Sequence, residues 1–290
     1  MIVVIVGPTG VGKSKFALEL APLINAEIVN GDAFQIYKEM NIGVAKPPKE
    51  YFEKVPHHLY SFVSIDTPYS IKEYQSDARK VIDEILSKKK NVIIVGGSGL
   101  YIRSALYDYE FQNSTFVDMS KYEKMNNLAL HHELEMIDPI DAAKIHPNNR
   151  RRVLRSIQIY LENGESKSSL ISKQKHEPIY ENTLFVMPNF DKEELYNNIN
   201  SRVDIMIKEG LLDEVAQLYK TYKDNQAMEA IGYKEFVPYF NNEISLEDVI
   251  DKIKQDTRNY AKRQITFFKY QFELKRFDNL NELLEIVKNV

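Results

Sequence analysis

The chain has 290 residues, of which 43% are hydrophobic, so it is long enough to bury a substantial core in one large domain or in one domain with an insertion. It has no cysteine, which excludes disulfides, cysteine-ligated zinc and thiol catalysis, and no apolar run approaches the ~20 residues of a membrane span, so we expect a soluble, cytoplasmic protein without a membrane partner. The formal net charge of −4 argues against broad polyanion binding, and any nucleic-acid site must therefore be local.

A phosphate-binding loop follows the first predicted strand. The apolar run 2–6 predicts a buried strand, and the pattern 14–24 predicts the helix after the loop. In this context a glycine-rich turn directs backbone N–H groups and a helix N-terminus at an anion, while Lys13 adds a positive charge and Ser14 offers a hydroxyl to Mg²⁺. The loop predicts that a di- or triphosphate binds, without saying which, to Gly7, Pro8, Thr9, Gly10, Val11, Gly12, Lys13 and Ser14.

Strands and helices alternate through the first 110 residues. Further strands are predicted over 27–30 and 91–95, and residues 70–73 have the pattern of a capping box that begins a helix. This alternation indicates an α/β fold with a parallel sheet, of the kind found in P-loop nucleoside triphosphatases. Ligands of such sheets bind at the carboxyl ends of the strands, where the phosphate loop, Asp32 and Ser98 all fall.

An inserted helical subdomain is predicted over 111–181, where polar residues become frequent and the apolar runs shorten. Asp138 has the position of a helix start, and a helix after Asn149 ends near Gly164. The catalytic core is then expected to comprise 1–110 and 182–290. The second part of this core contains a predicted strand over 183–187 and predicted helices over 192–209, 211–222 and 245–270.

Two basic clusters contrast with the acidic average of the chain. One helix of the insertion carries Arg150, Arg151, Arg152 and Arg155, and the last predicted helix carries Arg258, Lys262 and Arg263 among the aromatic residues Tyr260, Phe267 and Phe268. Such surfaces contact nucleic-acid backbones and stack on unpaired bases. Solvated helix faces and buried aromatics explain the same pattern equally well.

Asp32 is the acidic residue expected nearest to the phosphate loop. Three roles fit its position after the second strand: a turn residue, a group that contacts a magnesium ligand, or a general base. A nucleotide hydrolase usually places a Mg²⁺-binding Asp after a hydrophobic strand. Here the run 92–95 continues into Gly96 and Gly97 instead, which argues against phosphoryl transfer.

Six distinctive stretches span nearly the whole chain: GPTGVGKS, NGDAFQIYKEMNIGVAKP, VGGSGLY, HPNNRRRVLRS, AIGYKE and TRNYAKRQITFF. In this order they resemble the motifs of the tRNA dimethylallyltransferases. The resemblance implies transfer of a dimethylallyl group from its diphosphate to N6 of the adenosine immediately 3′ of the anticodon, adenosine 37. It also implies that the phosphate loop holds the prenyl diphosphate with Mg²⁺, that Asp32 takes the proton from N6, and that Arg202 supplies a second cation to the diphosphate.

The resemblance further implies a set of tRNA contacts. It places Ser98 with Asp32 in the catalytic group, although Ala33 and Ser98 stand where the family usually has serine and threonine. The insertion resembles the family's clamp for the anticodon stem, and the enzyme is expected to be a monomer. The implied tRNA-binding residues are Asp32, Ala33, Phe34, Gln35, Ser98, Arg151, Arg152, Val153, Leu154 and Arg155, and the last helix adds Arg258, Lys262 and Arg263.

Two other functions remain as alternatives at this point. The nearer one is prenylation of a free adenine nucleotide, as in the related adenylate isopentenyltransferases, and the basic insertion argues for RNA instead. A small-molecule P-loop kinase is more distant, because it needs a site for the nucleotide base and an Asp after a strand, and neither is evident.

Overall fold

The computed structural model describes residues 1–111, 116–174 and 176–290, which form two compact units. The first unit comprises Met1–Leu106 and Tyr180–Val290, and the second comprises Tyr107–Ile179. The sequence places the insertion at 111–181, a few residues later at both ends, and residues 112–115 and 175 of that range lie outside the described residues.

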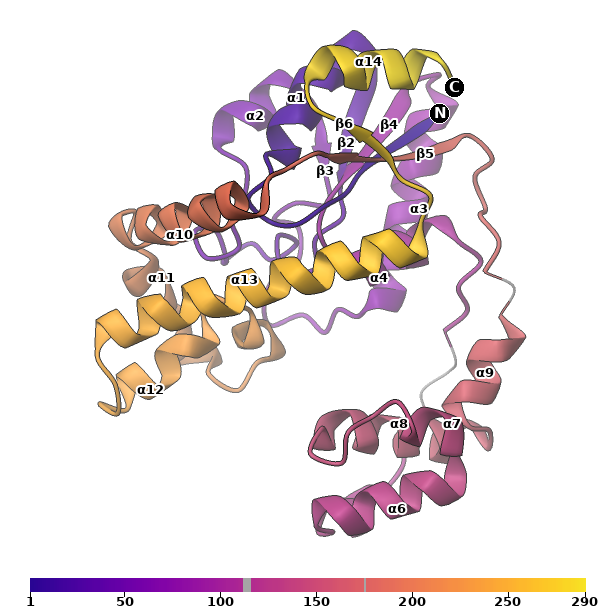
Figure 1. The fold of residues 1–290 in the computed structure, drawn as a ribbon, viewed down its shortest axis with the longest axis vertical. Coiled ribbons are helices and arrows are strands. Elements are labelled where there is room, and N and C mark those ends of the chain that lie inside the picture. The colour runs from indigo at the N-terminus through magenta and orange to yellow at the C-terminus, as the bar shows by residue number, and fades with distance from the viewer. Residues whose placement is uncertain (112–115, 175) are drawn as a thin grey trace. The chain divides into compact units, whose positions relative to one another are not determined.

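A six-stranded parallel sheet forms the centre of the first unit (Figure 1). Its strand order is β3-β2-β4-β1-β5-β6, with β1 in register between β4 and β5. The predicted α/β fold with a P-loop-type parallel sheet is confirmed. The strands are β1 Ile2–Ile5, β2 Ala26–Asn30, β3 His57–His58, β4 Asn91–Val95, β5 Thr183–Pro188 and β6 Lys275–Phe277.

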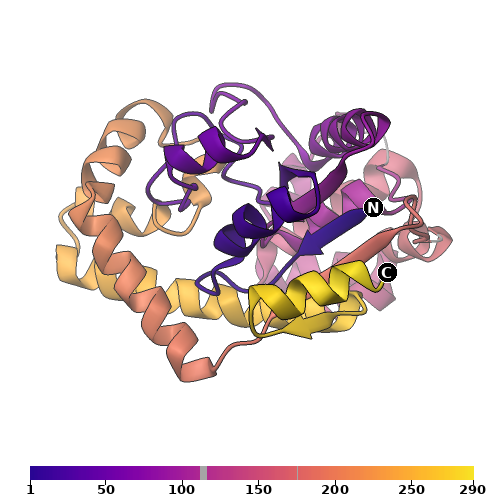
Figure 2. The same cartoon turned by 90° about the horizontal axis from the view of Figure 1, so that it is seen from above.

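Helices cover this sheet. Two helices of the first unit, one on the sheet and one in the helical layer described below, begin where the sequence predicts. The capping boxes of Ser70 with Glu73 and of Ser245 with Asp248 are both formed. Figure 2 shows α14 beside α1, and the rings of Phe16 and Phe277 meet edge to face in this region, 5.0 Å apart. The helices around the sheet are α1 Lys13–Leu23, α2 Lys49–Lys54, α3 Ile71–Ser87, α4 Gly99–Leu106 and α14 Leu280–Lys288.

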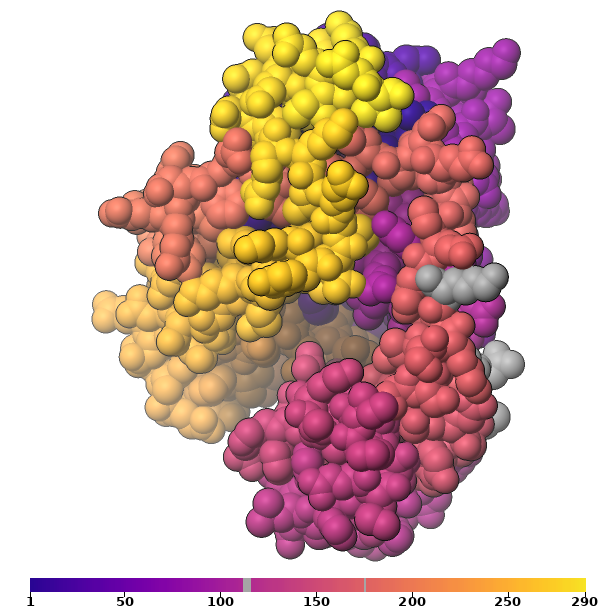
Figure 3. Space-filling view, turned by 45° about the vertical axis from the view of Figure 1, so that its right-hand side comes forward, coloured from indigo at the N-terminus to yellow at the C-terminus, as the bar shows by residue number. Residues whose placement is uncertain are grey.

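A helical layer completes the first unit. It has its own buried cluster, in which Met40, Tyr233 and Phe236 are fully covered. Figure 3 shows the C-terminal part of the chain, in yellow, on the surface of this unit. The layer contains α10 Lys192–Lys208, α11 Leu211–Tyr222, the 3₁₀ helices Gln226–Glu229 and Lys234–Phe236, α12 Val237–Phe240 and α13 Leu246–Gln271.

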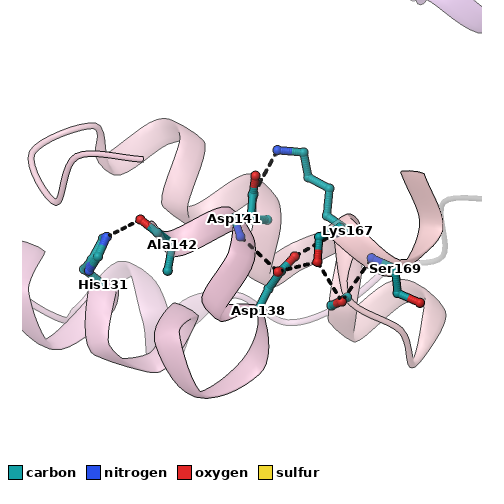
Figure 4. A network of polar contacts seen from close by, with 9 residues as sticks. His131, Asp138, Asp141, Ala142, Lys167 and Ser169 are labelled. Carbon is teal, nitrogen blue, oxygen red and sulfur yellow. Dashed lines mark hydrogen bonds and ion pairs between the residues drawn. The ribbon is translucent and has the colours of Figure 1, made fainter. Parts of the chain in front are cut away.

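The second unit is helical in its described part, and a polar network holds its helices together (Figure 4). Asp138 caps α7 and also accepts a hydrogen bond from the amide of Ser168, while Asp141 binds Lys167 at 2.9 Å. Its apolar cluster includes Leu130 and Ile157. The helices are α5 Ser120–Glu123, α6 Asn127–Ile137, α7 Pro139–Ala142, α8 Arg150–Asn163 and α9 Lys167–Lys173.

Within the described residues, no helix is long and apolar enough to cross a membrane.

Candidate active site

The phosphate loop leads directly from β1 into α1. Every residue of β1 is buried, which fixes the loop at the carboxyl end of the central strand. Gly12 caps α1 with φ 78°, a left-handed conformation that glycine adopts without strain. As it has no side chain to occupy the first-turn amides of α1, those amides are available to an anion, as at other helix N-termini that bind phosphate.

Burial changes the pKa values of both Lys13 and Asp32 beside this loop. The ammonium group of Lys13 donates to the carbonyl of Pro8 at 2.7 Å. Burial lowers the pKa of Lys13 to about 7, opposed by the negative charge of Asp32. Burial raises the pKa of Asp32, opposed by hydrogen bonds from backbone amides and by the charges of Lys13 and Arg202. The cavity therefore disfavours the charged form of both groups.

Residues 32–35 form a turn that holds the Asp32 carboxylate. Asp32 Oδ1 accepts a hydrogen bond from the amide of Phe34 at 2.9 Å, and the Asn30 side chain accepts one from the amide of Asp32 at 2.9 Å. The hydroxyl of Ser98 accepts the amide of Ala33 at 3.0 Å. The Ser98 side chain thus orients the turn.

One side chain from α13 joins the two halves of the site. Gln264, only 5% exposed, accepts a hydrogen bond from the amide of Thr9 at 3.0 Å. Its amide nitrogen donates to the carbonyl of Gly97 at 2.9 Å. A Cβ atom on Gly97 would lie 2.0 Å from that nitrogen, so only glycine permits this approach. Gln264 therefore fixes the phosphate loop relative to the turn that carries Ser98.

A cavity of about 520 Å³ lies between these elements in the first unit, large enough for a small organic ligand. Its lining includes the phosphate loop and Asp32 together with apolar side chains of α10 and α13. Basic groups from several elements face the same space. The lining includes Thr9, Gly10, Gly12, Lys13, Ser14, Asp32, Phe34, Gln35, Lys46, Tyr60, Ile199, Arg202, Val203, Met206, Ile231, Lys234, Ile253, Tyr260, Arg263 and Gln264.

The site fits Mg²⁺ only in combination with a phosphate ligand. Among the described residues, no group of three or more His, Cys, Asp or Glu side chains is arranged to hold a metal ion. Ser14 lines the cavity beside the loop, and Asp32 lines it as well. Mg²⁺ is commonly bound by one or two protein oxygens together with substrate phosphates and waters. A serine hydroxyl beside a diphosphate site meets that requirement.

Several predicted site residues do not line the cavity. Gly7, Pro8 and Val11 belong to the loop but not to the cavity wall, and Ala33 and Ser98 lie behind the Asp32 turn. Arg258 donates to Asn200 of α10 at 2.5 Å, and Lys262 lies over the ring of Tyr196. Of the two readings of the aromatic residues on the last helix, burial holds for Phe268, whose side chain is fully covered.

The arginines of α8 divide into two kinds. Arg151, Arg152 and Arg155 are exposed, as a backbone-binding surface requires. Arg150 of the same basic cluster has a different role, since its guanidinium donates to the carbonyls of Tyr122, Glu123 and Met125 and to the side chain of Asn127. Val153 is fully buried in the apolar cluster of the second unit and Leu154 packs against that cluster, so the Val153 side chain does not reach RNA.

The sequence alone did not identify Lys46, Tyr60 or Lys234 as cavity residues, nor Gln264 as a bridge. Lys46 and Lys234 do fall within the distinctive stretches NIGVAKP and AIGYKE, which is the signal that could have found them. Nothing in the local pattern around Tyr60 indicates a role, because its position depends on the fold.

Comparisons with known proteins point to one family. A family model described as IPP transferase matches residues 35–271. The tRNA dimethylallyltransferase of Anoxybacillus flavithermus is 41% identical over 286 residues, which cover 98% of this chain and 92% of the relative. The tRNA dimethylallyltransferase of Staphylococcus saprophyticus is 44% identical over 289 residues, which cover 96% and 91%.

Solved structures agree with these relatives. A tRNA isopentenylpyrophosphate transferase from Staphylococcus epidermidis matches with a TM-score of 0.73 and 38% identity, covering 99% of this chain and 97% of that one. A eukaryotic dimethylallyltransferase acting on tRNA matches with a TM-score of 0.80 and 31% identity, covering 97% and 75%.

Proposed function

Because this chain belongs to the IPP transferase family, we propose that it transfers a dimethylallyl group from dimethylallyl diphosphate to N6 of adenosine 37 in tRNA. The products are N6-dimethylallyladenosine and diphosphate. One observation supports this chemistry most directly: Lys13, Ser14 and Asp32 line a single cavity, which brings an anion site and a carboxylate together. Transfer of a dimethylallyl group needs both, one for the leaving group and one for the proton.

The phosphate loop serves the leaving group. As the bond between C1 of the dimethylallyl group and the diphosphate oxygen breaks, negative charge grows on the diphosphate. The amides at the start of α1, the ammonium of Lys13 and the guanidinium of Arg202 are fixed donors that stabilise this charge. Because they are held in place before the reaction, they need little reorganisation.

Asp32 serves the nucleophile. The exocyclic amine of adenine is weakly nucleophilic, and N6 must lose a proton as its bond to C1 forms. The Asp32 carboxylate accepts that proton, and burial raises its pKa towards the range in which a general base is effective. Ser98 and Gln264 act as positioning residues for the Asp32 turn and the phosphate loop.

Mg²⁺ would be held by Ser14 together with the diphosphate oxygens. When bound, it neutralises charge on the leaving group as a Lewis acid.

Recognition of the RNA is assigned to both units. An adenosine inside the anticodon loop must leave its stack to reach a cavity, so we propose that it is flipped towards Asp32, Phe34 and Gln35. The exposed Arg151, Arg152 and Arg155 contact phosphates of the anticodon stem, and the second unit acts as the clamp. Arg263, which lines the cavity, is the RNA contact that we propose for the first unit.

The test separates the three candidate reactions. The protein is incubated with Mg²⁺ and dimethylallyl diphosphate together with unmodified tRNA or with AMP, or with ATP and a metabolite mixture, and the products are analysed by mass spectrometry. We expect a gain of one dimethylallyl group on adenosine 37 of the tRNA alone. Prenylated AMP without prenylated tRNA, or consumption of ATP, would contradict the proposal.

A further inference from the structure

One carboxylate of the helical layer collects hydrogen bonds from a segment that reaches the cavity. Glu214, on α11, accepts hydrogen bonds from three successive amides, those of Asn41 at 3.0 Å, Ile42 at 2.9 Å and Gly43 at 3.2 Å. It also accepts the hydroxyl of Tyr233 at 2.6 Å. The three amides lie 171 to 173 residues from Glu214 along the chain, whereas Tyr233 lies 19 residues from it.

The segment that Glu214 binds is a tight turn over residues 41–46. The amide of Ala45 donates to Ile42 at 2.9 Å and the amide of Lys46 donates to Asn41 at 3.1 Å, while Ala45 has φ 55°. This is the hydrogen-bond pattern of a Schellman turn, in which amides point out of one end and carbonyls out of the other. A non-glycine residue keeps a left-handed conformation only where its surroundings hold it.

The ring of Tyr233 supports the middle of this turn. A Cβ atom on Gly43 would lie 2.4 Å from a ring carbon of Tyr233, so the backbone lies directly on the ring. Tyr233 is fully buried, which leaves the turn little freedom to move on that side.

The other end of the turn orients two cavity residues. The side-chain amide of Gln35 donates to the carbonyls of Val44 at 3.0 Å and Ala45 at 3.1 Å. The guanidinium of Arg202 donates to the carbonyl of Ala45 at 3.4 Å. Gln35 belongs to the Asp32 turn and Arg202 faces the diphosphate in the proposed reaction, so the 41–46 turn connects the two halves of the chemistry.

We propose that Glu214 is a positioning residue for dimethylallyl transfer, which fixes the 41–46 turn so that its carbonyls align Gln35 and Arg202 in the cavity. This inference rests on the proposed function, because it assigns Arg202 to the diphosphate and Gln35 to the RNA side. Glu214 acts from outside the cavity wall. Misplacement of a binding group by about 1 Å can cost roughly 10²-fold in rate, so a distant anchor of this kind has a measurable effect.

The main variant is Glu214→Gln. The glutamine amide presents an NH₂ group where the carboxylate accepts backbone N–H donors, so the turn loses part of its anchor while the side-chain volume stays the same. We expect kcat/KM for dimethylallyl diphosphate to fall by roughly 10-fold or more, and the affinity for inorganic diphosphate, measured by calorimetry, to fall with it. Glu27→Gln is the matched control, because Glu27 is likewise a carboxylate held by hydrogen bonds, but its partners His58 and Lys90 lie outside the 41–46 turn. It should lower the melting temperature and leave the kinetic constants of the folded protein unchanged.

A double-mutant cycle tests the route through Arg202. If Glu214 acts by orienting Arg202, the double variant Glu214→Gln, Arg202→Lys loses less diphosphate affinity than the product of the fold-losses of the two single variants. Tyr233→Phe keeps the ring on Gly43 and removes only one bond to Glu214, so it provides a milder variant if Glu214→Gln does not fold. The inference would be overturned if the double variant shows the full product of the two fold-losses. It would also be overturned if the folded Glu214 and Tyr233 variants bind diphosphate with wild-type affinity. A wild-type protein that binds diphosphate but does not prenylate tRNA would instead overturn the proposed function.

Discussion

The pKa values of Lys13 and Asp32 shift in opposite directions because the same cavity disfavours the charged form of each group. Burial lowers the pKa of the ammonium and raises the pKa of the carboxyl, while the attraction between the two charges opposes both shifts. The two groups therefore titrate as a coupled pair, and a ligand charge that enters the cavity acts on both. An arriving diphosphate favours the charged lysine and disfavours the charged carboxylate.

Asp32→Asn tests the proton acceptor. The variant keeps the size of the side chain but cannot accept a proton, so single-turnover transfer should fall by roughly 10²–10⁴-fold while tRNA and diphosphate still bind. The reactive form is the deprotonated carboxylate, so the wild-type rate should rise with pH through a pKa above the ordinary aspartate value. This rise of the rate with pH should be absent in the variant. Equal losses of binding and rate would assign Asp32 to structure or to magnesium instead.

Lys13 should take up a proton when diphosphate binds. Its pKa in the free protein is about 7, and a bound anion raises that pKa, so binding above pH 7 is coupled to proton uptake and affinity falls as the pH rises. Calorimetry of diphosphate binding at pH 8 in two buffers of different ionisation enthalpy measures this uptake. Lys13→Ala should abolish most of it and reduce transfer by roughly 10²-fold, with tRNA binding intact. Unchanged proton uptake in the variant would assign it to another group.

Gln264→Ala should loosen both loops of the site. It removes the hydrogen bond that the Gln264 side chain accepts from the amide of Thr9, and the bond that it donates to the carbonyl of Gly97, which keeps only the longer bond from the Tyr260 hydroxyl at 3.4 Å. A polar group left unpaired costs about 1–3 kcal/mol when it is buried. Urea unfolding should show this loss, and diphosphate affinity should fall as well. Gln271→Ala is a suitable comparison, because Gln271 lies on the same helix with its side chain exposed and bound only to Arg103. Equal effects of the two changes would argue against the bridging role.

At the scale of elements, strong local sequence patterns predict helices and strands correctly, whereas weak sequence patterns do not. The two capping boxes and the apolar strand Asn91–Val95 could be predicted because each combines a local hydrogen-bond pattern or an apolar run with clear boundaries. The strand His57–His58 has two residues and no periodicity, and it exists because it pairs with β2. The edge strand Lys275–Phe277 is equally short and pairs with β5.

The same distinction applies to the site. Lys13 and Asp32 could be predicted because motifs with a defined chemistry contain them. Glu214 and Gln264 could not be assigned roles, since the loops that they hold lie 167 to 255 residues away along the chain. Composition does not separate Arg150 from the exposed arginines beside it, because only the fold brings backbone carbonyls to its guanidinium. The resemblance assigns Val153 to the tRNA with its whole motif, although its side chain is buried.

Helix α8 offers a comparison within one element. If Arg152 and Arg155 contact phosphates, Arg152→Ala and Arg155→Ala should each weaken tRNA binding and reduce the slope of log affinity against log salt by about one charge, without changing diphosphate affinity. Arg150→Ala should instead lower thermal stability, because it leaves several carbonyl groups unpaired. An unchanged salt slope for Arg152 and Arg155 would make them solvated surface residues.

At the scale of the whole molecule, the two ends of the second unit pair with each other. Tyr107 pairs with Pro178, and the amide of Asp108 donates to Glu177 at 2.9 Å, so the two connecting segments run together. Replacement of residues 107–179 by a short glycine–serine linker should therefore leave the first unit folded and able to bind diphosphate. Filter binding should show the loss of most tRNA affinity. Loss of diphosphate binding in a folded shortened chain would contradict this division of roles.

The central place of β1 in the sheet also determines when the protein can finish folding on the ribosome. The strand Ile2–Ile5 is synthesised first, yet its partners are β4 and β5, and the whole second unit is synthesised between them. During that interval an apolar strand has one open edge, the kind of surface that promotes aggregation, while the second unit folds through contacts close in sequence. Translation of the second unit is therefore the period in which this chain most depends on protection of its sheet, and β6 can pair with β5 only after that unit and β5 have been made.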